Sequence, residues 1–353
     1  MKIETIEAIR FTYPTDTCHD SDGHGHPGPW TDTTGAMLVI SCDDGTTGRV
    51  IAAPADVAEP LLTQFVRPVL TGADPMRHEQ LWRALYKWQR GSAGRLTDRL
   101  LAAVDLALWD LQGKREQQPV VALLGGTPGT KLPTYHTVWS TEDLATTGEH
   151  AGYKLHLGKI AAPEQRDLMV ASIEQARSSI GASPLLMVDA WMKWDIESTI
   201  SISQAIKPFQ VEWIEEPLSP DDLAGYAILK EKTAVPIAGG EHEFTAEAFR
   251  PLIEQKLHAV LQPDVNWCGG LTELIRIYTM AKEAGLRVCP HRGCEIWALH
   301  AIAALDPQPL AETGRPWMTW VKGQPEIQQG MIEVSDRPGF GLLFDEHQLQ
   351  LVN

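Results

Sequence analysis

The stretch 185-LLMVD-189, 211-VEWIE-215 and 235-VPIAGGE-241 consists of three short apolar runs, each of which ends in a carboxylate. The three acids, Asp189, Glu215 and Glu241, follow one another at intervals of 26 residues. A buried strand followed by a helical return forms a βα unit, and one such unit per interval predicts neighbouring parallel strands. The three carboxylates are therefore expected to converge at the C-terminal ends of these strands.

Converging carboxylates repel one another unless a cation lies between them. An acid-rich site with only oxygen ligands suits a hard divalent ion, so Mg²⁺ is favoured over Zn²⁺. Taken singly, each acid could instead cap a helix N-terminus or pair with an arginine. The equal spacing on consecutive units favours Asp189, Glu215 and Glu241 as metal ligands, since a barrel collects such residues at its active face.

Length and composition restrict the class of protein. The chain has 353 residues, of which 43% are hydrophobic, and this suggests two domains. A formal net charge of −16 without any basic run argues against binding to nucleic acid or to an anionic membrane. The five dispersed cysteines include no CxxC pair, and no apolar run reaches about 18 residues. We therefore expect a cytoplasmic protein in a reducing compartment.

The first 118 residues predict an α+β domain. A strand at 2–12 and a hairpin at 36–42 and 48–53, around Asp43-Asp44-Gly45, precede two helices at 76–89 and 95–114. The segment 15–34, rich in Gly, Pro, Asp and His, is predicted to be a long loop. Its His24, His26 and Trp30 could contact substrate, and a solvated loop or a fortuitous chelator is the alternative.

Short strands and helices alternate from residue 132 onward. Strands are predicted at 132–138, 153–157, 185–189, 211–215, 236–239, 259–262, 287–290 and 310–312. Helical stretches lie between them, for example at 164–179, 221–232, 271–283 and 295–304. The pattern predicts a parallel α/β barrel at 119–324, of the TIM type, and a turn-rich tail at 325–353 that returns to the N-terminal domain. No dinucleotide-binding GxGxxG follows a strand.

The remaining strand ends are polar as well. The second strand carries Lys154 and His156 on one face, and the sixth, seventh and eighth deliver Asp264, His291 and Glu312. On adjacent strands, Asp264 and His291 are expected to form a carboxylate–imidazole pair, which makes His291 the best general base or acid. The alternative for His291 is a buried ring satisfied by a backbone carbonyl.

This combination of groups suits removal of a proton next to a carboxylate. The enediolate that forms carries negative charge on the oxygens of the acid, and Mg²⁺ together with a cationic Lys154 stabilises that charge. Glu312, if protonated, donates a hydrogen bond to the same oxygens. Trp191 follows the first metal ligand and either shapes the pocket or belongs to the core.

The same residues resemble the mandelate racemase subgroup of the enolase superfamily, and among its members the L-rhamnonate dehydratases. The resemblance covers nearly the whole chain and rests on Lys154-x-His156, the three acids, the Asp264/His291 pair, Glu312, and the runs 189-DAWM-192, 213-WIEE-216, 240-GEH-242, 262-QPDV-265 and 290-PH-291. It implies a (β/α)₇β barrel, a modified TIM barrel, under an α+β capping domain, with Mg²⁺ and usually a homo-oligomer. It also implies that the capping loops, here with His24, His26 and Trp30, recognise the distal end of a sugar acid.

One position departs from the pattern of the subgroup. Members that racemise carry a second lysine where this chain has His156, and that lysine serves one face of the substrate. The resemblance therefore favours a one-base dehydration that gives a 2-keto-3-deoxy acid, a hydro-lyase reaction, with His291 as the base. A racemase or epimerase that uses His156 as the second base remains the alternative, and a sugar-acid sensor without catalysis is a third possibility.

Overall fold

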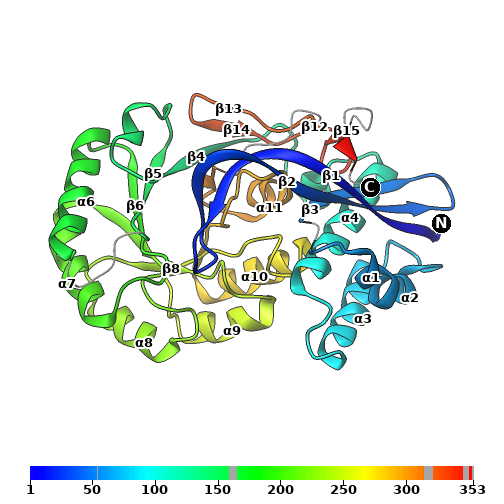
Figure 1. Cartoon of the computed structure of the whole chain (residues 1–353), viewed down its shortest axis with the longest axis horizontal. Helices are drawn as coiled ribbons and strands as arrows, with labels where there is room; N and C mark the ends of the chain where they lie inside the picture. Colours follow the sequence, from blue (N-terminus) through cyan, green and yellow to red (C-terminus); the bar gives the residue numbers. More distant parts are fainter. Residues whose placement is uncertain (54, 159–164, 314–320, 345–349, 352–353) are drawn as a thin grey trace.

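The computed structural model describes the whole chain except residues 54, 159–164, 314–320, 345–349 and 352–353 (Figure 1). An N-terminal domain with a sheet and helices packs beside a larger domain built of parallel strands and outer helices (Figure 1). No helix among the described residues is long and apolar enough to cross a membrane.

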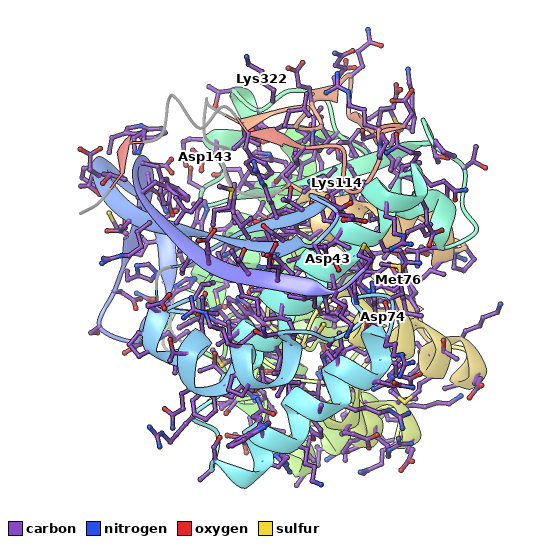
Figure 2. The ribbon with its side chains drawn as sticks, turned by 90° about the vertical axis from the view of Figure 1, so that its right-hand side faces the viewer. Asp43, Asp74, Met76, Lys114, Asp143 and Lys322 are labelled. Atoms are coloured by element: carbon purple, nitrogen blue, oxygen red, sulfur yellow. The ribbon has the colours of Figure 1, made fainter. Side chains whose placement is uncertain are left out.

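The N-terminal domain is built on an antiparallel sheet with the strand order β16-β1-β2-β3. Its strands are β1 (Ile3–His19), β2 (Gly25–Cys42), β3 (Thr47–Ala52) and β16 (Gln350–Leu351). The helices of this domain are α1 (Glu59–Leu61), the π-helix η1 (Leu62–Val66), α2 (Arg67–Leu70), α3 (His78–Gly91) and α4 (Asp98–Glu116). Asp43, in the β2–β3 turn, and Asp74 lie at the same end of this sheet (Figure 2). There the backbone amide of Asp43 donates to the carbonyl of Lys2, and the amide of Ile3 donates to the carbonyl of Ala73.

The predicted long loop at 15–34 is wrong, because β1 and β2 continue through most of it. Their ladder runs on to the pair His19↔Gly25, with an irregularity between Thr15 and Thr17, and leaves a tight turn at 20–24. Prolines are tolerated because, among the described residues, no third strand pairs with this part of the ribbon. The dark blue ribbon leaves the sheet and bends down over the barrel (Figure 1).

The expected barrel strands are present. They are β4 (Lys131–Val138), β5 (Gly152–His156), β6 (Leu185–Asp189), β7 (Val211–Glu215), β8 (Ile237–Gly239), β9 (Val260–Leu261), β10 (Arg287–Val288) and β11 (Ala311–Glu312). Parallel pairing runs from β11 through β4 to β10. Next to the gap between β10 and β11, the thiols of Cys289 and Cys294 donate to the carbonyls of Leu310 and Ala311 at 3.5 and 3.4 Å.

Helices return the chain between these strands. They are α6 (Arg166–Ile180), α7 (Ile196–Ile206), α8 (Leu223–Lys232), α9 (Ala246–Glu254), α10 (Leu271–Ala284) and α11 (Ile296–Leu305). The first unit differs from the simple βα pattern, because a 3₁₀ turn at Asp143–Ala145 is the helical segment between β4 and β5. Before the barrel, α5 (Val120–Leu123) follows α4 directly.

The interior of the barrel is filled by one apolar layer. Its buried members are Tyr135, Met187, Trp213, Ala238, Val260, Cys289 and Leu310. Since side chains alternate between the two faces of a strand, the residue two positions later also points inward, toward the C-terminal mouth. This rule places Asp189, Glu215 and Glu312 directly above the apolar layer, with Thr137, Gln262 and His291 beside them.

The C-terminal tail contacts both bodies. Strands β13 (Ile327–Gln328) and β14 (Met331–Glu333) form a hairpin, and β14 pairs antiparallel with β4 of the barrel. Strands β12 (Val321–Lys322) and β15 (Leu343–Phe344) pair with each other, and β16 joins β1 at Phe11↔Leu351. The tail therefore first widens the sheet of the barrel through β14 and then pairs with the N-terminal sheet through β16.

Substitution of Gly48 by alanine is expected to destabilise the N-terminal domain. A Cβ at this position would collide with the carbonyl oxygen of Ala107 and lie 2.8 Å from Cβ of Leu111, both on α4. We expect a loss of about 1–3 kcal/mol in the free energy of unfolding, because the sheet must move off the helix. Thermal melting measures it. Gly91→Ala is the control, since nothing lies within 4 Å of that Cβ and alanine is the better helix former.

Candidate active site

A cavity of about 270 Å³ opens at the C-terminal ends of the barrel strands, beneath the turn of the β1–β2 ribbon. Nine of the residues that the sequence selects line it: His24, His26, Lys154, His156, Asp189, Trp191, Glu241, His291 and Glu312. Glu215 and Asp264 are buried directly behind this lining, at 2% and 1% exposure. Apart from Trp30, the predicted residues thus come together here from seven strands and the ribbon.

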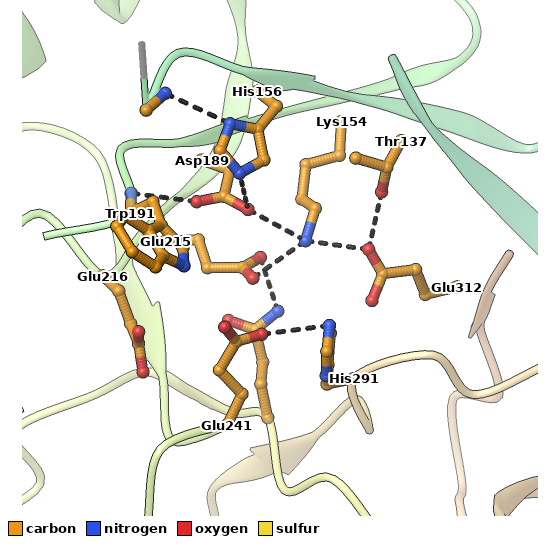
Figure 3. A network of polar contacts seen from close by, with 12 residues as sticks. Thr137, Lys154, His156, Asp189, Trp191, Glu215, Glu216, Glu241, His291 and Glu312 are labelled. Carbon is orange, nitrogen blue, oxygen red and sulfur yellow. Dashed lines mark hydrogen bonds and ion pairs between the residues drawn. The ribbon is translucent and has the colours of Figure 1, made fainter. Parts of the chain in front are cut away.

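Lys154 lies at the centre of a group of three carboxylates at the cavity (Figure 3). Its Nζ lies 2.8 Å from Oε1 of Glu215, 2.8 Å from Oε1 of Glu312 and 3.3 Å from Oδ2 of Asp189. Burial lowers the pKa of this ammonium, but the surrounding carboxylates outweigh burial and hold the pKa well above its ordinary value. Lys154 is therefore held in its protonated, cationic form.

The carboxylates around Lys154 carry more negative charge than one ammonium balances. Burial raises the pKa of Asp189 to about 6 and that of Glu215 to about 7; Lys154 opposes this rise, and the neighbouring carboxylates add to it. Such a set of buried oxygen donors is stabilised by a further positive charge. The donor set therefore fits a hard divalent cation.

A second acidic group lies next to the first. Among the described residues, one set of three possible ligands brings its donor atoms within 4.8 Å of one another, namely Glu216, Glu241 and His242. Nδ1 of His242 lies 2.7 Å from Oε2 of Glu216. Burial lowers the pKa of His242, but the bond to Glu216 and the charge of Glu241 outweigh burial and raise it to about 9. Glu216 is thus already paired with an imidazolium.

Asp264 and His291 form the contact that their spacing suggests. Nδ1 of His291 lies 3.0 Å from Oδ2 of Asp264, and the amide of Asn266 donates to Oδ1 of Asp264 at 2.7 Å. Nε2 of His291 faces the cavity, 3.1 Å from Oε2 of Glu241 (Figure 3). Burial raises the pKa of Asp264, but the hydrogen bond and charge of His291 outweigh burial and lower it, so the carboxylate stays ionised and orients the ring.

The structure corrects the expectation for Glu312, which accepts hydrogen bonds instead of donating one. Oε1 of Glu312 receives Nζ of Lys154 and Oγ1 of Thr137, the latter at 2.6 Å, and Oε2 receives the amide of Arg292 at 2.8 Å. Burial raises its pKa, but the charges of Lys154 and His291 and the hydrogen bonds from Lys154 and Thr137 outweigh burial and hold the pKa below its usual range. Glu312 is therefore an anion that holds Lys154 in place.

His156 lies in a stack of aromatic rings. The ring centroids of Trp139 and His156 are 4.1 Å apart, those of His156 and His24 4.7 Å, and those of His24 and Trp191 3.9 Å. Nε2 of His156 lies 3.1 Å from Nε2 of His24 and 3.5 Å from Oδ2 of Asp189. His24, on the ribbon, is only 4% exposed and belongs to this cavity.

The other two ribbon residues lie differently. His26 lines the cavity, and its Nδ1 is 3.0 Å from the carbonyl oxygen of Pro27. Trp30 is 64% exposed and lines a neighbouring cavity of about 390 Å³, between the ribbon, α4 and the barrel loops. The two cavities share wall residues of the ribbon and, from the barrel loops, Trp267 and Arg292.

Several residues of the site were not selected from the sequence. Thr137 and Gln262, whose Nε2 donates to Oε2 of Glu215 at 2.6 Å, stand two positions after Tyr135 and Val260 of the apolar layer. Strict alternation along β4 and β9 could have identified both. Glu216, His242 and Trp139 follow strand ends where the backbone turns, and Glu216 has a φ of +36°. Alternation does not extend to such positions.

Comparison with known proteins identifies the family. Residues 140–348 match the model described as "Enolase C-terminal domain-like", and residues 30–125 match "Mandelate racemase / muconate lactonizing enzyme, N-terminal domain". An L-rhamnonate dehydratase of Saccharopolyspora erythraea is 31% identical over 328 residues, which cover 87% of this chain and 83% of that protein.

Solved structures agree with this match. D-glucarate dehydratase from Agrobacterium tumefaciens, in complex with magnesium, has a TM-score of 0.91 and 30% identity over 100% of both chains. A racemase from Streptomyces coelicolor A3(2) with bound magnesium has a TM-score of 0.86 and 27% identity, over 99% of this chain and all of the other. The chain belongs to the mandelate racemase subgroup of the enolase superfamily.

Proposed function

We propose that the protein is a Mg²⁺-dependent sugar-acid dehydratase, a hydro-lyase that converts an aldonate of the L-rhamnonate type into a 2-keto-3-deoxy acid. The observation that carries this proposal is the placement of the Asp264–His291 pair and the cation Lys154 on one cavity beside a cluster of buried carboxylates. The named dehydratases among the relatives support the same class of reaction.

The proposed Mg²⁺ ligands are Asp189, Glu215 and Glu241. Asp189 and Glu215 point into the barrel and have raised pKa values, so they gain from a cation. Glu216, by contrast, is neutralised by His242 and also receives the amide of Gly240 at 3.2 Å. Glu241 lies between the two groups and completes the first. When bound, Mg²⁺ supplies positive charge to the carboxylate oxygens of the substrate.

Neutralising Glu215 is expected to weaken Mg²⁺ binding by about 100-fold, because an anionic ligand becomes a neutral amide. The variant is Glu215→Gln. Glu216→Gln, the same substitution at the adjacent residue, is the matched control, and we expect it to weaken Mg²⁺ binding by less than about tenfold. Isothermal titration calorimetry with MgCl₂ measures both. If the order of the two effects is reversed, the metal is held by Glu216, Glu241 and His242 instead.

In the proposed mechanism, Nε2 of His291 removes the proton from the α-carbon while Asp264 fixes the ring through Nδ1. Glu241, which contacts Nε2 of His291, would hold the cation when it is bound, and Nε2 would then be able to accept a proton. Lys154 donates to a carboxylate oxygen of the substrate and stabilises the enediolate, and Glu312 holds Lys154 in position. The protonated His291 then returns its proton to the β-hydroxyl, which leaves as water, and the resulting enol tautomerises to the 2-keto acid.

The distal part of the substrate is assigned to the ribbon and its neighbours. His24, His26 and Trp191 border the cavity, and Trp30 borders the adjoining one, so all four are proposed to contact the sugar chain or its path of entry. Cytoplasmic location and a homo-oligomeric assembly stay predictions.

An epimerase or racemase is the second candidate, because His156 borders the cavity on a different strand from His291. In that reaction, one base removes the α-proton and the other returns a proton to the opposite face. Solvent deuterium in recovered starting acid of inverted configuration, with no keto product, would select it.

The proposed function is tested by a screen of purified, Mg²⁺-supplemented protein against mono- and di-acid sugars, with semicarbazide detection of 2-keto-3-deoxy products. We expect a product that disappears on chelation. If no acid of the panel gave a keto product, dehydration of these acids would be refuted, and the epimerase reaction would be tested next.

A further inference from the structure

The imidazole of His156 has one hydrogen bond whose direction is fixed by the backbone. The amide of Gly158 donates to Nδ1 of His156 at 3.1 Å. An amide nitrogen only donates, so Nδ1 must present its lone pair. A neutral His156 therefore carries its proton on Nε2, and a doubly protonated ring would set two N–H groups against each other.

His24 is placed to accept a hydrogen bond from this N–H of His156. Its Nε2 lies 3.1 Å from Nε2 of His156, so one of the two nitrogens must donate and the other accept. Nδ1 of His24 lies 3.8 Å from Oδ2 of Asp20, and this carboxylate favours the N–H form of Nδ1. Burial, followed by the neighbouring His156, lowers the pKa of His24 to about 4, which leaves the ring neutral. Its Nε2 then offers a lone pair.

The turn of the ribbon is held so that His24 stays in this position. Oδ1 of Asp20 accepts the amides of Asp22 and His24 at 2.9 and 3.0 Å, which fixes the turn from within. Asp22 forms an ion pair with Lys193 of the loop after β6, which ties the turn to the barrel. Stacking on Trp191 supports the second face of His24.

These contacts form one chain with a single direction. Gly158 N–H donates to Nδ1 of His156, and Nε2–H of His156 donates to Nε2 of His24. The amide of Gly158 fixes this direction, because an amide can only donate, and the negative charge of Asp20, 3.8 Å from Nδ1 of His24, favours the same arrangement. We propose that His24 and Gly158 are positioning residues that hold His156 as an Nε2–H hydrogen-bond donor, so that His156 is not a second base.

The catalytic consequence rests on the proposed function, while the tautomer itself does not. A ring whose Nε2 carries the proton and whose Nδ1 faces an amide has no lone pair to offer to an α-proton. In the resting site His156 gives this N–H to Nε2 of His24 at the wall of the cavity, where a hydroxyl or carboxylate oxygen of the substrate would compete with His24 for it. The site then holds one base, His291, and this favours elimination over two-base inversion.

The tautomer is tested directly by NMR of the resting full-length protein labelled with ¹⁵N-histidine, with and without MgCl₂. We expect the pattern of an unprotonated Nδ1 and a protonated Nε2 for His156, and the opposite pattern for His24. Signals are assigned with His156→Gln and His24→Gln. An Nδ1–H tautomer or a doubly protonated ring for His156 at neutral pH overturns the inference.

Variants of the turn report on the role of His24. In His24→Leu the Nε2–H signal of His156 is expected to exchange faster with water, because its acceptor is gone, and His24→Gln is expected to restore slow exchange through its side-chain oxygen. Asp20→Asn should shift the ring signals of His24 but leave the tautomer of His156 set by Gly158. The exposed His19→Gln is the control and should change neither ring. An unchanged exchange rate in His24→Leu contradicts the assignment.

The catalytic consequence is tested with two variants of His156. Glutamine keeps an N–H near the place of Nε2 but cannot act as a base, whereas leucine removes the donor. We expect His156→Gln to keep kcat within about tenfold of the wild type and His156→Leu to lose about 100-fold. If both lose activity equally, the donor role is wrong. If no sugar acid is dehydrated while NMR shows the Nε2–H tautomer, the proposed function fails and the tautomer assignment stands.

Discussion

His291→Asn is expected to abolish turnover of the sugar acid, with kcat lower by about 10³-fold, a typical effect of removing a general base. Nε2 of His291 is the nitrogen of the Asp264 pair that faces the cavity, and asparagine leaves no group of similar basicity there. Mg²⁺ binding should persist, since no proposed ligand is removed. Initial rates of 2-keto-3-deoxy acid formation and calorimetric Mg²⁺ titration measure the two properties.

The matched control for this variant is His19→Asn, which removes an exposed histidine outside the cavity of Lys154. Its kcat should equal that of the wild type. An active His291→Asn enzyme would assign the base elsewhere, with His156 as the first candidate. Loss of Mg²⁺ binding together with activity would instead show that His291 supports the metal site through Glu241.

Lys154→Met is expected to abolish activity and, in the presence of EDTA, to lower the free energy of unfolding by about 3–5 kcal/mol, the usual result of removing one partner from a buried ion pair. The ammonium contacts Asp189, Glu215 and Glu312, all nearly inaccessible to solvent. Saturating Mg²⁺ should recover part of the lost stability, because a cation returns to the same carboxylates. Denaturant unfolding with EDTA or MgCl₂ measures both effects.

Lys114→Met is the control for a lysine paired with a buried acid far from the barrel mouth. Nζ of Lys114 lies 2.6 Å from Oδ2 of Asp110, but Asp110 also accepts the amides of Arg49 and Phe340. Lys114→Met should therefore lose less free energy of unfolding than Lys154→Met, and added Mg²⁺ should not restore that loss. If both variants lost the same free energy of unfolding, or if Mg²⁺ did not stabilise Lys154→Met, the carboxylates around Lys154 would not need a cation.

The sequence sufficed for the barrel because its signal is local and repeated. Most of the buried strands are short, apolar and followed by a helical return, and six of the seven inward residues of the apolar layer are followed two positions later by a polar one, as Trp213 is by Glu215, while Ala238 is followed by Gly240. Side-chain alternation then places the functional residues at one end of the barrel. The contacts of Lys154 with Glu215 and Glu312 follow from this placement.

The ribbon could not be predicted from composition. Gly, Pro and Asp between residues 15 and 34 are typical of loops, yet here most of this segment pairs across a two-strand ladder that tolerates proline, since no third described strand joins it. The burial of His24 between His156 and Trp191 depends on contacts between segments more than 130 residues apart. The ionisation of Glu312 likewise depends on its three donors, and the pairing of Glu216 with His242 on backbone turns after two strands.

The route of the C-terminal tail limits how the molecule can open. Strand β14 lies on β4 of the barrel, and β16 lies on β1 of the N-terminal sheet, so the polypeptide crosses between the two bodies twice. A cap joined by one linker can swing about it as a hinge, but two crossings oppose such a rotation. The ribbon at 13–34 pairs only with itself among the described residues and can bend without disturbing either core. Entry of substrate and exit of product should therefore depend on flexing of this ribbon, at a rate set by the contacts of its tip.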